Sequence, residues 1–149
     1  MSKTGIACAL LALAMGSAAA FAGLGDDAAS VQSDLARMKG TLRSNTTPLY
    51  TIHEISTAYG TIVREYVSPA NKVFAVSWRG PQIPDLRQVL SGYYGQYDQA
   101  ASTPRIARRH LVIDQPGLVM QSSGHTRAFF GRAWVPALLP AKFAVSEIH

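Results

Sequence analysis

The side chains with the most evident capacity for catalysis or metal binding are the histidines His53, His110, His125 and His149. None of them lies in HExxH, HxH or another tight ligand spacing, so the sequence predicts no metal site. The stretch SSGH, which begins at Ser122, places hydroxyl groups close to an imidazole. A nucleophile and its base also need an orienting third group and an oxyanion hole, and we therefore expect no catalytic residue here.

A small hydrolase is nevertheless the alternative function, and it would use His125 or His110 as a base together with Asp114. A cleft that joins a histidine, a carboxylate and a hydroxyl would favour the enzyme. Exposed histidines spread over a flat surface would favour a binding module. The sequence has no GxSxG motif, phosphate loop or dinucleotide fingerprint, so no cofactor is expected.

Two turns set the register of a meander of three strands that we predict over residues 50–79. The stretch SPAN (68–71) suits a type I turn with Asn71 in the left-handed conformation. The stretch TAYG (57–60) permits the same turn with Gly60 in that conformation. Residues that face each other across two strands share one face of a sheet. The predicted core face of the meander holds Tyr50, Ile52, Ile62, Tyr66, Phe74, Val76 and Trp78.

This register makes Tyr66 face Phe74 and points the adjacent charges Arg64 and Glu65 to opposite faces of the sheet. Arg64 then faces Glu54 on the core face, whereas Glu65 faces His53 on a smaller and more polar face. We interpret Glu54 and Arg64 as a structural pair that fixes the register. The alternative is that a partly buried pair marks a pocket.

A helix is predicted within residues 81–102, where Asp85 fits the N-cap and Gln88 the matching position of a capping box. A shorter helix is expected over residues 25–39, ended by Gly40 and packed loosely against the domain. The longer helix presents a stripe at helical spacing that is typical of a buried face: Leu86, Val89, Leu90, Tyr93, Tyr94 and Tyr97.

Three further strands are predicted in the second half of the chain, over residues 110–114, 118–124 and 125–136, with Gly117 and Gly124 in the turns. The two prolines of PALLPAKF then break regular structure. The expected fold is α+β: an antiparallel meander sheet of about five to six strands, packed by one amphipathic helix, with a short N-terminal helix.

Residues 1–22 have the pattern of a secretory signal peptide, with Lys3 before an apolar run and small residues around Ala22. We expect cleavage there, export to the periplasm or the extracellular medium, and a single α+β domain over residues 23–149. The one cysteine, Cys8, lies in the leader, so the mature domain is free of cysteine and forms no disulfide. The leader is too short and too rich in alanine for a stable membrane span.

Removal of the leader leaves 13 lysines and arginines against 9 acidic residues, a net charge of +4. Such a balance favours contact with anionic surfaces. The densest basic run, RIARRH, lacks the aromatic residues that stack on nucleobases, so no nucleic acid partner is expected. We expect a non-enzymatic binding or envelope-associated module whose partner is an anionic envelope component or another exported protein. The candidate contact residues are Arg105, Arg108, Arg109, His53 and Glu65.

Several stretches of the chain resemble a family of small exported bacterial proteins, the domain of unknown function 2844. They are GTIVREYVSP, VFAVSW, GPQIPDLRQVL and GRAWVPALLP, and the similarity extends over nearly all of residues 23–149. The family pattern has glycine where this chain has Asn71, a replacement that a left-handed turn position tolerates. The resemblance implies export and a single domain, and it carries no catalytic residue or cofactor to any position.

Overall fold

The computed structural model describes residues 23–103 and 110–149. Its strands form one antiparallel sheet of seven strands in the order β1-β2-β3-β4-β7-β6-β5. The strands are β1 (Thr41–Thr46), β2 (Thr51–Ser56), β3 (Ile62–Val67), β4 (Val73–Gly80), β5 (His110–Gln115), β6 (Leu118–His125) and β7 (Ala128–Trp134). The α-helices are α1 (Val31–Met38), α2 (Leu86–Leu90) and α3 (Tyr94–Ser102). The predicted α+β class is confirmed, but the sheet has more strands than the five to six expected.

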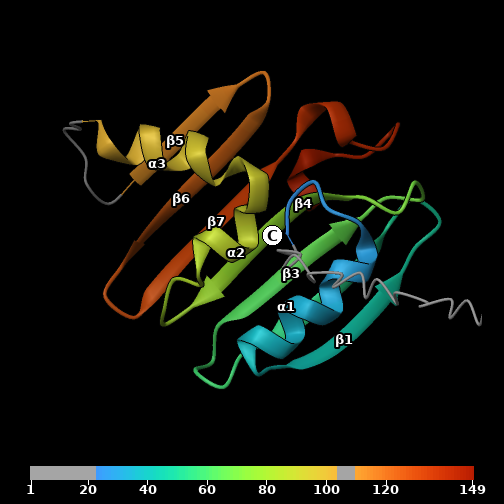
Figure 1. The fold of residues 1–149 in the computed structure, drawn as a ribbon, viewed down its shortest axis with the longest axis horizontal. Coiled ribbons are helices and arrows are strands. Elements are labelled where there is room, and N and C mark those ends of the chain that lie inside the picture. Colours follow the sequence, from blue (N-terminus) through green and yellow to red (C-terminus); the bar gives the residue numbers. More distant parts are fainter. Residues whose placement is uncertain (1–22, 104–109) are drawn as a thin grey trace, which may run out of the picture.

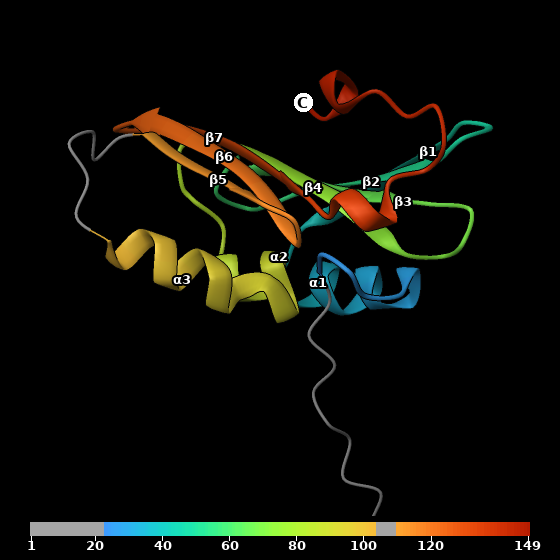
Figure 2. The same cartoon turned by 90° about the horizontal axis from the view of Figure 1, so that it is seen from above.

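The sheet separates two layers of the chain, as Figure 2 shows. Helices α1, α2 and α3 lie on one side, which we call the helix-covered face. Residues 135–149 lie on the other side, which we call the C-terminal face, and they include short 3-10 turns at Pro136–Leu138 and Val145–Glu147. Figure 1 shows the strands crossing the molecule diagonally between these layers. In the described part of the chain, no helix combines the length and the apolar character needed to cross a membrane.

Both predicted turns have the expected backbone conformation. Asn71 has φ 63° and Gly60 has φ 83°, which are left-handed values. The main-chain N–H of Asn71 donates to the oxygen of Ser68, and that of Gly60 donates to the oxygen of Thr57. The turn at Gly60 sets the register between β2 and β3 as predicted, with Glu54 opposite Arg64.

The register between β3 and β4 differs from the prediction beyond its first pair. Val67 faces Val73 as expected, but Tyr66 faces Ala75 instead of Phe74 because the register shifts between Tyr66 and Val67. The shift leaves Phe74 as an extra residue of β4, which is the geometry of a β-bulge. Every later residue of β4 therefore lies on the face opposite to the one predicted.

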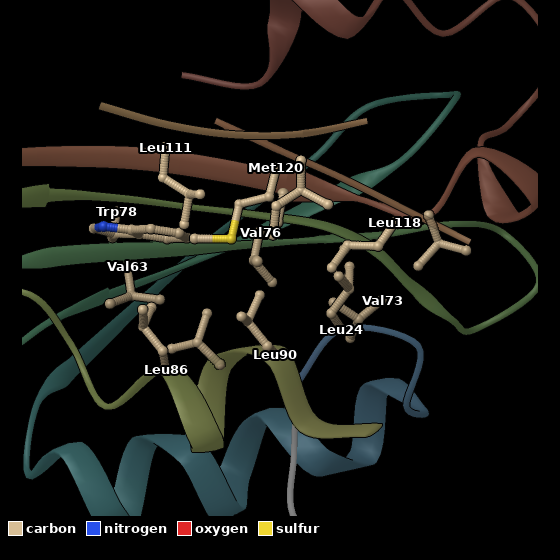
Figure 3. Close-up of a cluster of buried hydrophobic side chains, with 14 of the residues drawn as sticks. Leu24, Val63, Val73, Val76, Trp78, Leu86, Leu90, Leu111, Leu118 and Met120 are labelled. Carbon is tan, nitrogen blue, oxygen red and sulfur yellow. The ribbon is translucent and has the colours of Figure 1, made fainter. Parts of the chain in front are cut away.

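As a result, the predicted core face is divided between the two sides of the sheet. The larger cluster of buried side chains lies under the helices, where Leu86 and Leu90 point from α2 toward the sheet (Figure 3). Its strand residues include Val63, Val76 and Trp78. A second cluster on the C-terminal face contains Tyr66, Phe74, Ala75, Trp134 and Ile148.

Two features of the sheet depart from the sequence-based expectation. Strand β1 was not predicted, because its sequence TLRSNT is polar and lacks the apolar residues typical of a strand. It is mostly exposed and is held at the sheet edge by pairing with β2. The turn of the last hairpin was predicted at Gly124, which is too early in the chain. Gly124 belongs to β6, and the turn lies at Thr126 and Arg127, with Arg127 in the left-handed region at φ 65°.

The predicted helix over residues 81–102 is broken into α2, a 3-10 turn and α3 at Ser91, whose φ is 46°. Asp85 caps α2 as predicted, since its side chain accepts from the main-chain N–H of Arg87 at 2.9 Å. The predicted capping box is wrong. Gln88 is buried and its Nε2 donates instead to Asp34 Oδ1 of α1 at 2.5 Å.

Gly131 of β7 is where the sheet approaches the Trp78 indole most tightly. A Cβ atom at Gly131 would lie 2.2 Å from Trp78 Cζ2, and Trp78 is buried and cannot move aside. We predict that Gly131→Ala lowers the free energy of unfolding by about 1 to 3 kcal/mol. Gly92→Ala is the matched control, because no atom lies within 4 Å of its added Cβ. Urea unfolding of both variants tests this, and equal stability would contradict the packing described here.

Candidate functional site

The C-terminal face of the sheet carries polar side chains that hold the last residues of the chain. The main-chain oxygen of His149 accepts hydrogen bonds from Arg64 Nη1, from Tyr66 Oη at 3.2 Å and from Ser77 Oγ at 3.1 Å. Arg132 Nη1 donates to the main-chain oxygen of Ile148 at 3.2 Å. Donors from β3, β4 and β7 therefore fix residues 145–149 against the sheet.

A side-chain contact adds to this attachment. Tyr50 Oη donates to Glu147 Oε2 at 2.5 Å. This hydrogen bond, followed by burial, raises the pKa of Tyr50 to about 12. The Tyr50 ring also packs edge-on against Phe143, with 5.1 Å between the ring centroids. The C-terminal segment is consequently held by both polar and aromatic contacts.

Beside this segment lies a groove of about 410 Å³ over strands β4, β7 and β6. Its volume is within the range of about 300 to 1,000 Å³ that is usual for ligand pockets. The backbone pairing explains its composition, because Phe130 faces both Arg79 and Ser123, and Arg132 faces Gln121. The groove is lined by Trp78, Arg79, His110, Gln121, Ser122, Ser123, Phe130, Gly131, Arg132, Ile148 and His149.

Neither arginine of the groove, Arg79 or Arg132, is paired with an aspartate or glutamate side chain of the described residues. Arg132 Nε and Nη2 donate to Gln121 Oε1 at 2.9 and 2.8 Å, so its partners are neutral oxygens. Arg79 is exposed. The ion pairs of residues 23–103 and 110–149 include Arg64 with Glu54 and Lys72 with Asp27, neither of which involves an arginine of the groove. The groove has no aspartate or glutamate in its lining and is therefore electropositive.

The predicted pair of Glu54 and Arg64 is present in the structure. Arg64 Nε lies 2.9 Å from Glu54 Oε2, and both side chains are about a quarter exposed. Arg64 also donates to the main-chain oxygen of His149, so this pair anchors the C-terminal segment as well as the register. The pair lies outside the lining of the groove.

His53 and Glu65 face each other across β2 and β3 as predicted, but they do not form an exposed surface. His53 is half-buried, its Nδ1 lies 2.8 Å from Ser44 Oγ, and burial lowers its pKa. The side chain of Glu65 is fully buried, so its predicted exposed position is wrong. The β-bulge and helix α1 explain the error, because the face expected to be thin and polar carries the main core.

Glu65 instead forms a buried carboxyl pair with Asp34 of α1. Burial, followed by a hydrogen bond with Asp34, raises the pKa of Glu65 to about 9, and burial also raises the pKa of Asp34. Neither Glu65 oxygen has another donor, and Asp34 Oδ2 has none either. A proton on one carboxyl group must therefore supply the hydrogen bond to the other.

The residues of the alternative hydrolase are not brought together. His110 pairs with Ser123 at one end of β5, whereas Asp114 pairs with Val119 toward the other end. Four residues along a strand separate His110 from Asp114 by about 13 Å. His125 lies two residues beyond Ser123, farther still from Asp114.

The remaining predicted contact residues are the three arginines of the basic run. Arg105, Arg108 and Arg109 lie outside the described residues. Among the residues that the structure describes, no group of three or more His, Cys, Asp or Glu side chains could hold a metal ion.

The sequence reasoning missed the groove, although a signal for it was present. In AFFGRAW, Phe130 and Arg132 alternate with Gly131 and Ala133, which is the period of a strand with two different faces. What could not be read was that β7 lies next to β4, since these strands are about 50 residues apart in the chain. That neighbourhood brings Arg79 to Phe130.

The fold and the groove together define a small α+β domain whose antiparallel sheet is covered on both faces and carries one electropositive groove beside its C-terminal segment. The chain belongs to the family described as "Protein of unknown function (DUF2844)", whose profile matches residues 20–148. No curated protein and no solved structure matches the chain.

The buried pair predicts an unusual dependence of stability on pH. The pKa of this carboxyl group rises from 4.5 to about 9 on folding. Between pH 4.5 and about 9, the group is therefore protonated in the folded protein and ionised in the unfolded chain. The free energy of unfolding should therefore fall with rising pH across this window, by up to about 1.4 kcal/mol per pH unit. Glu65→Gln removes the titrating group but keeps a donor for Asp34, so its stability should change less with pH.

Urea unfolding at about pH 5 and pH 8 measures the effect, since both values lie inside this window. Asp114→Asn is the matched control, because Asp114 is an exposed acid of the same domain. If the free energy of unfolding fell as steeply with pH in Glu65→Gln as in Asp114→Asn, Glu65 would not be the group that holds a proton in the folded protein.

Proposed function

We propose that the protein is an exported, non-enzymatic binding module, periplasmic or extracellular, that takes an anionic ligand with an apolar part into the groove beside its C-terminal segment. The observation that carries this proposal is that the groove is lined by Arg79 and Arg132 and by no aspartate or glutamate side chain. The positive charge of a guanidinium whose hydrogen bonds go to amide and carbonyl oxygens is not cancelled by them.

The position of the charge strengthens its effect on a ligand. Arg132 is half-buried against residues 145–149, where charges are screened less by water and salt than at an open surface. Phe130 is 55% exposed and offers an aromatic surface beside it. A carboxylate, sulfonate or phosphate on an apolar body fits these groups.

The same groove weighs against the hydrolase. It contains His110 beside Ser123, which supplies an imidazole and a hydroxyl. Its lining has no aspartate or glutamate side chain to orient the imidazole. The exposed His110, His125 and His149 are the arrangement expected of a binding module.

Export and the wider partner are supported by the sequence. The leader pattern of residues 1–22 favours secretion, and the charge of +4 on the remaining chain favours an anionic component of the cell envelope. Arg105, Arg108 and Arg109 precede His110 in the sequence and stay a predicted second contact. Replacing all three by alanine tests that contact separately from the groove.

The groove is tested with two fluorescent probes that share an aromatic body and differ in charge. Anilinonaphthalene sulfonate carries an anion, and phenylnaphthylamine carries none. We expect Arg79→Gln to weaken binding of the sulfonate about fivefold to tenfold, because a charge-assisted contact is lost. Binding of the neutral probe should stay within about twofold, since Phe130 still supplies its apolar contact.

Arg43→Gln is the matched control, because Arg43 is an exposed arginine of β1 that does not line the groove. Its affinity for both probes should equal that of the unaltered protein. If Arg79→Gln left sulfonate binding unchanged, or weakened both probes equally, an anion-binding groove would be ruled out. Phe130→Ser should weaken both probes and separates the apolar from the ionic contact.

A further inference from the structure

One end of the sheet collects three connections that are far apart in the sequence. They are residues 57–61 between β2 and β3, residues 80–85 from the last residue of β4 onward, and residues 125–128, which span the turn between β6 and β7. Together we call them the loop end. Figure 1 shows all three along the same edge of the molecule. The first and last turns are separated by three strand spacings, which is about 14 Å.

Exposed apolar side chains concentrate at the loop end. Tyr59 is 70% exposed in the first connection, Ile83 is 48% exposed in the second, and Phe130 is 55% exposed two residues after the third. Of the described residues, the other large apolar side chains with comparable exposure are Leu49 and Val112, which lie elsewhere. Apolar side chains from three separate segments are therefore exposed at or near one end of the sheet.

Basic side chains surround these apolar ones. Arg127 lies at the tip of the last hairpin, and Arg79 is the second-last residue of β4. Lys39 follows α1 and precedes Gly40, which lies against the main-chain oxygen of Ser56 beside the first turn. Asp85, which caps α2, is an acidic residue of the same region.

The opposite end of the sheet, near the turn between β3 and β4, carries acidic residues. There Asp27 pairs with Lys72, and Asp26 accepts from Ser91. The molecule is thus polarised, with exposed arginines and apolar tips together at the loop end.

We propose that the loop end is a peripheral docking surface for an anionic lipid bilayer. Tyr59 and Ile83 enter the interfacial region between headgroups, while Arg127 and Lys39 contact the acidic headgroups. A tyrosine or isoleucine at such a boundary loses water contact on its apolar part, and basic residues close to the surface gain electrostatic energy. The inference rests on the loop tips and stands independently of the ligand in the groove.

Charge complementarity alone would also suit a soluble polyanion, but the apolar tips favour the bilayer. A polyanion in water contacts basic side chains and gains little from Tyr59 and Ile83. The exposed Tyr59 and Ile83, at the same end of the sheet as Arg127, suit a bilayer, which has anionic headgroups at its surface and an apolar interior.

The test is co-sedimentation of the protein with vesicles of phosphatidylglycerol and phosphatidylcholine, and with vesicles of phosphatidylcholine alone. We expect binding to the first, weakened by added salt, and little binding to the second. The double variant Tyr59→Ser/Ile83→Ser should bind at least about tenfold more weakly. Arg127→Gln should bind about fivefold more weakly. Arg79 and Phe130 are left unchanged, so the groove is intact in every variant.

The matched control is Leu49→Ser/Val112→Ser, which removes two apolar side chains of similar exposure from outside the loop end. It should bind like the unaltered protein, and thermal unfolding shows that each variant is folded. Absence of binding to anionic vesicles at low salt would overturn the proposal. Normal binding by Tyr59→Ser/Ile83→Ser together with loss by Arg127→Gln would also overturn it and would assign the surface to a soluble polyanion.

Discussion

The extra residue in β4 at the β-bulge determines what each face of this sheet can do. Because side chains alternate along a strand, one inserted residue moves all later side chains of that strand to the opposite face. Beyond Phe74, the bulge places Val76 and Trp78 under the helices and leaves Ser77 and Arg79 on the C-terminal face. Without it, Trp78 would lie where Arg79 now lines the groove.

The division of faces explains why both sides of the sheet are covered. The helix-covered face buries a continuous apolar cluster and needs α1 and α2 to exclude water from it. The C-terminal face mixes aromatic rings with Arg64, Tyr66 and Ser77, so the segment that covers it must offer main-chain oxygens as acceptors. A single strand of chain does this better than a helix, whose oxygens are used internally.

The groove and the loop end are two consequences of the same arrangement. Residues 145–149 are held over β3, β4 and part of β7, and the groove lies beside them over β4, β7 and β6. Charge is distributed in the same direction. Glu54 neutralises Arg64 in the covered part, whereas neither Arg79 nor Arg132 forms an ion pair with an aspartate or glutamate of the described residues.

The sequence by itself determined the α+β class, the two left-handed turns, the pairing of Glu54 with Arg64 and the cap at Asp85. Each of these depends on residues close together in the chain, where turn geometry and strand alternation act directly. It also gave the right opposition of His53 and Glu65, since one tight turn fixes that register.

Tertiary structure alone decided the rest. The strand TLRSNT is held by pairing rather than by burial. The pKa of Glu65 is raised by burial and by its contact with Asp34 of α1. Gln88 donates to Asp34 instead of completing the cap of its own helix. The groove required β7 to lie beside β4. These outcomes depend on which distant segments meet and on the water they exclude, and a pattern read along the chain contains neither.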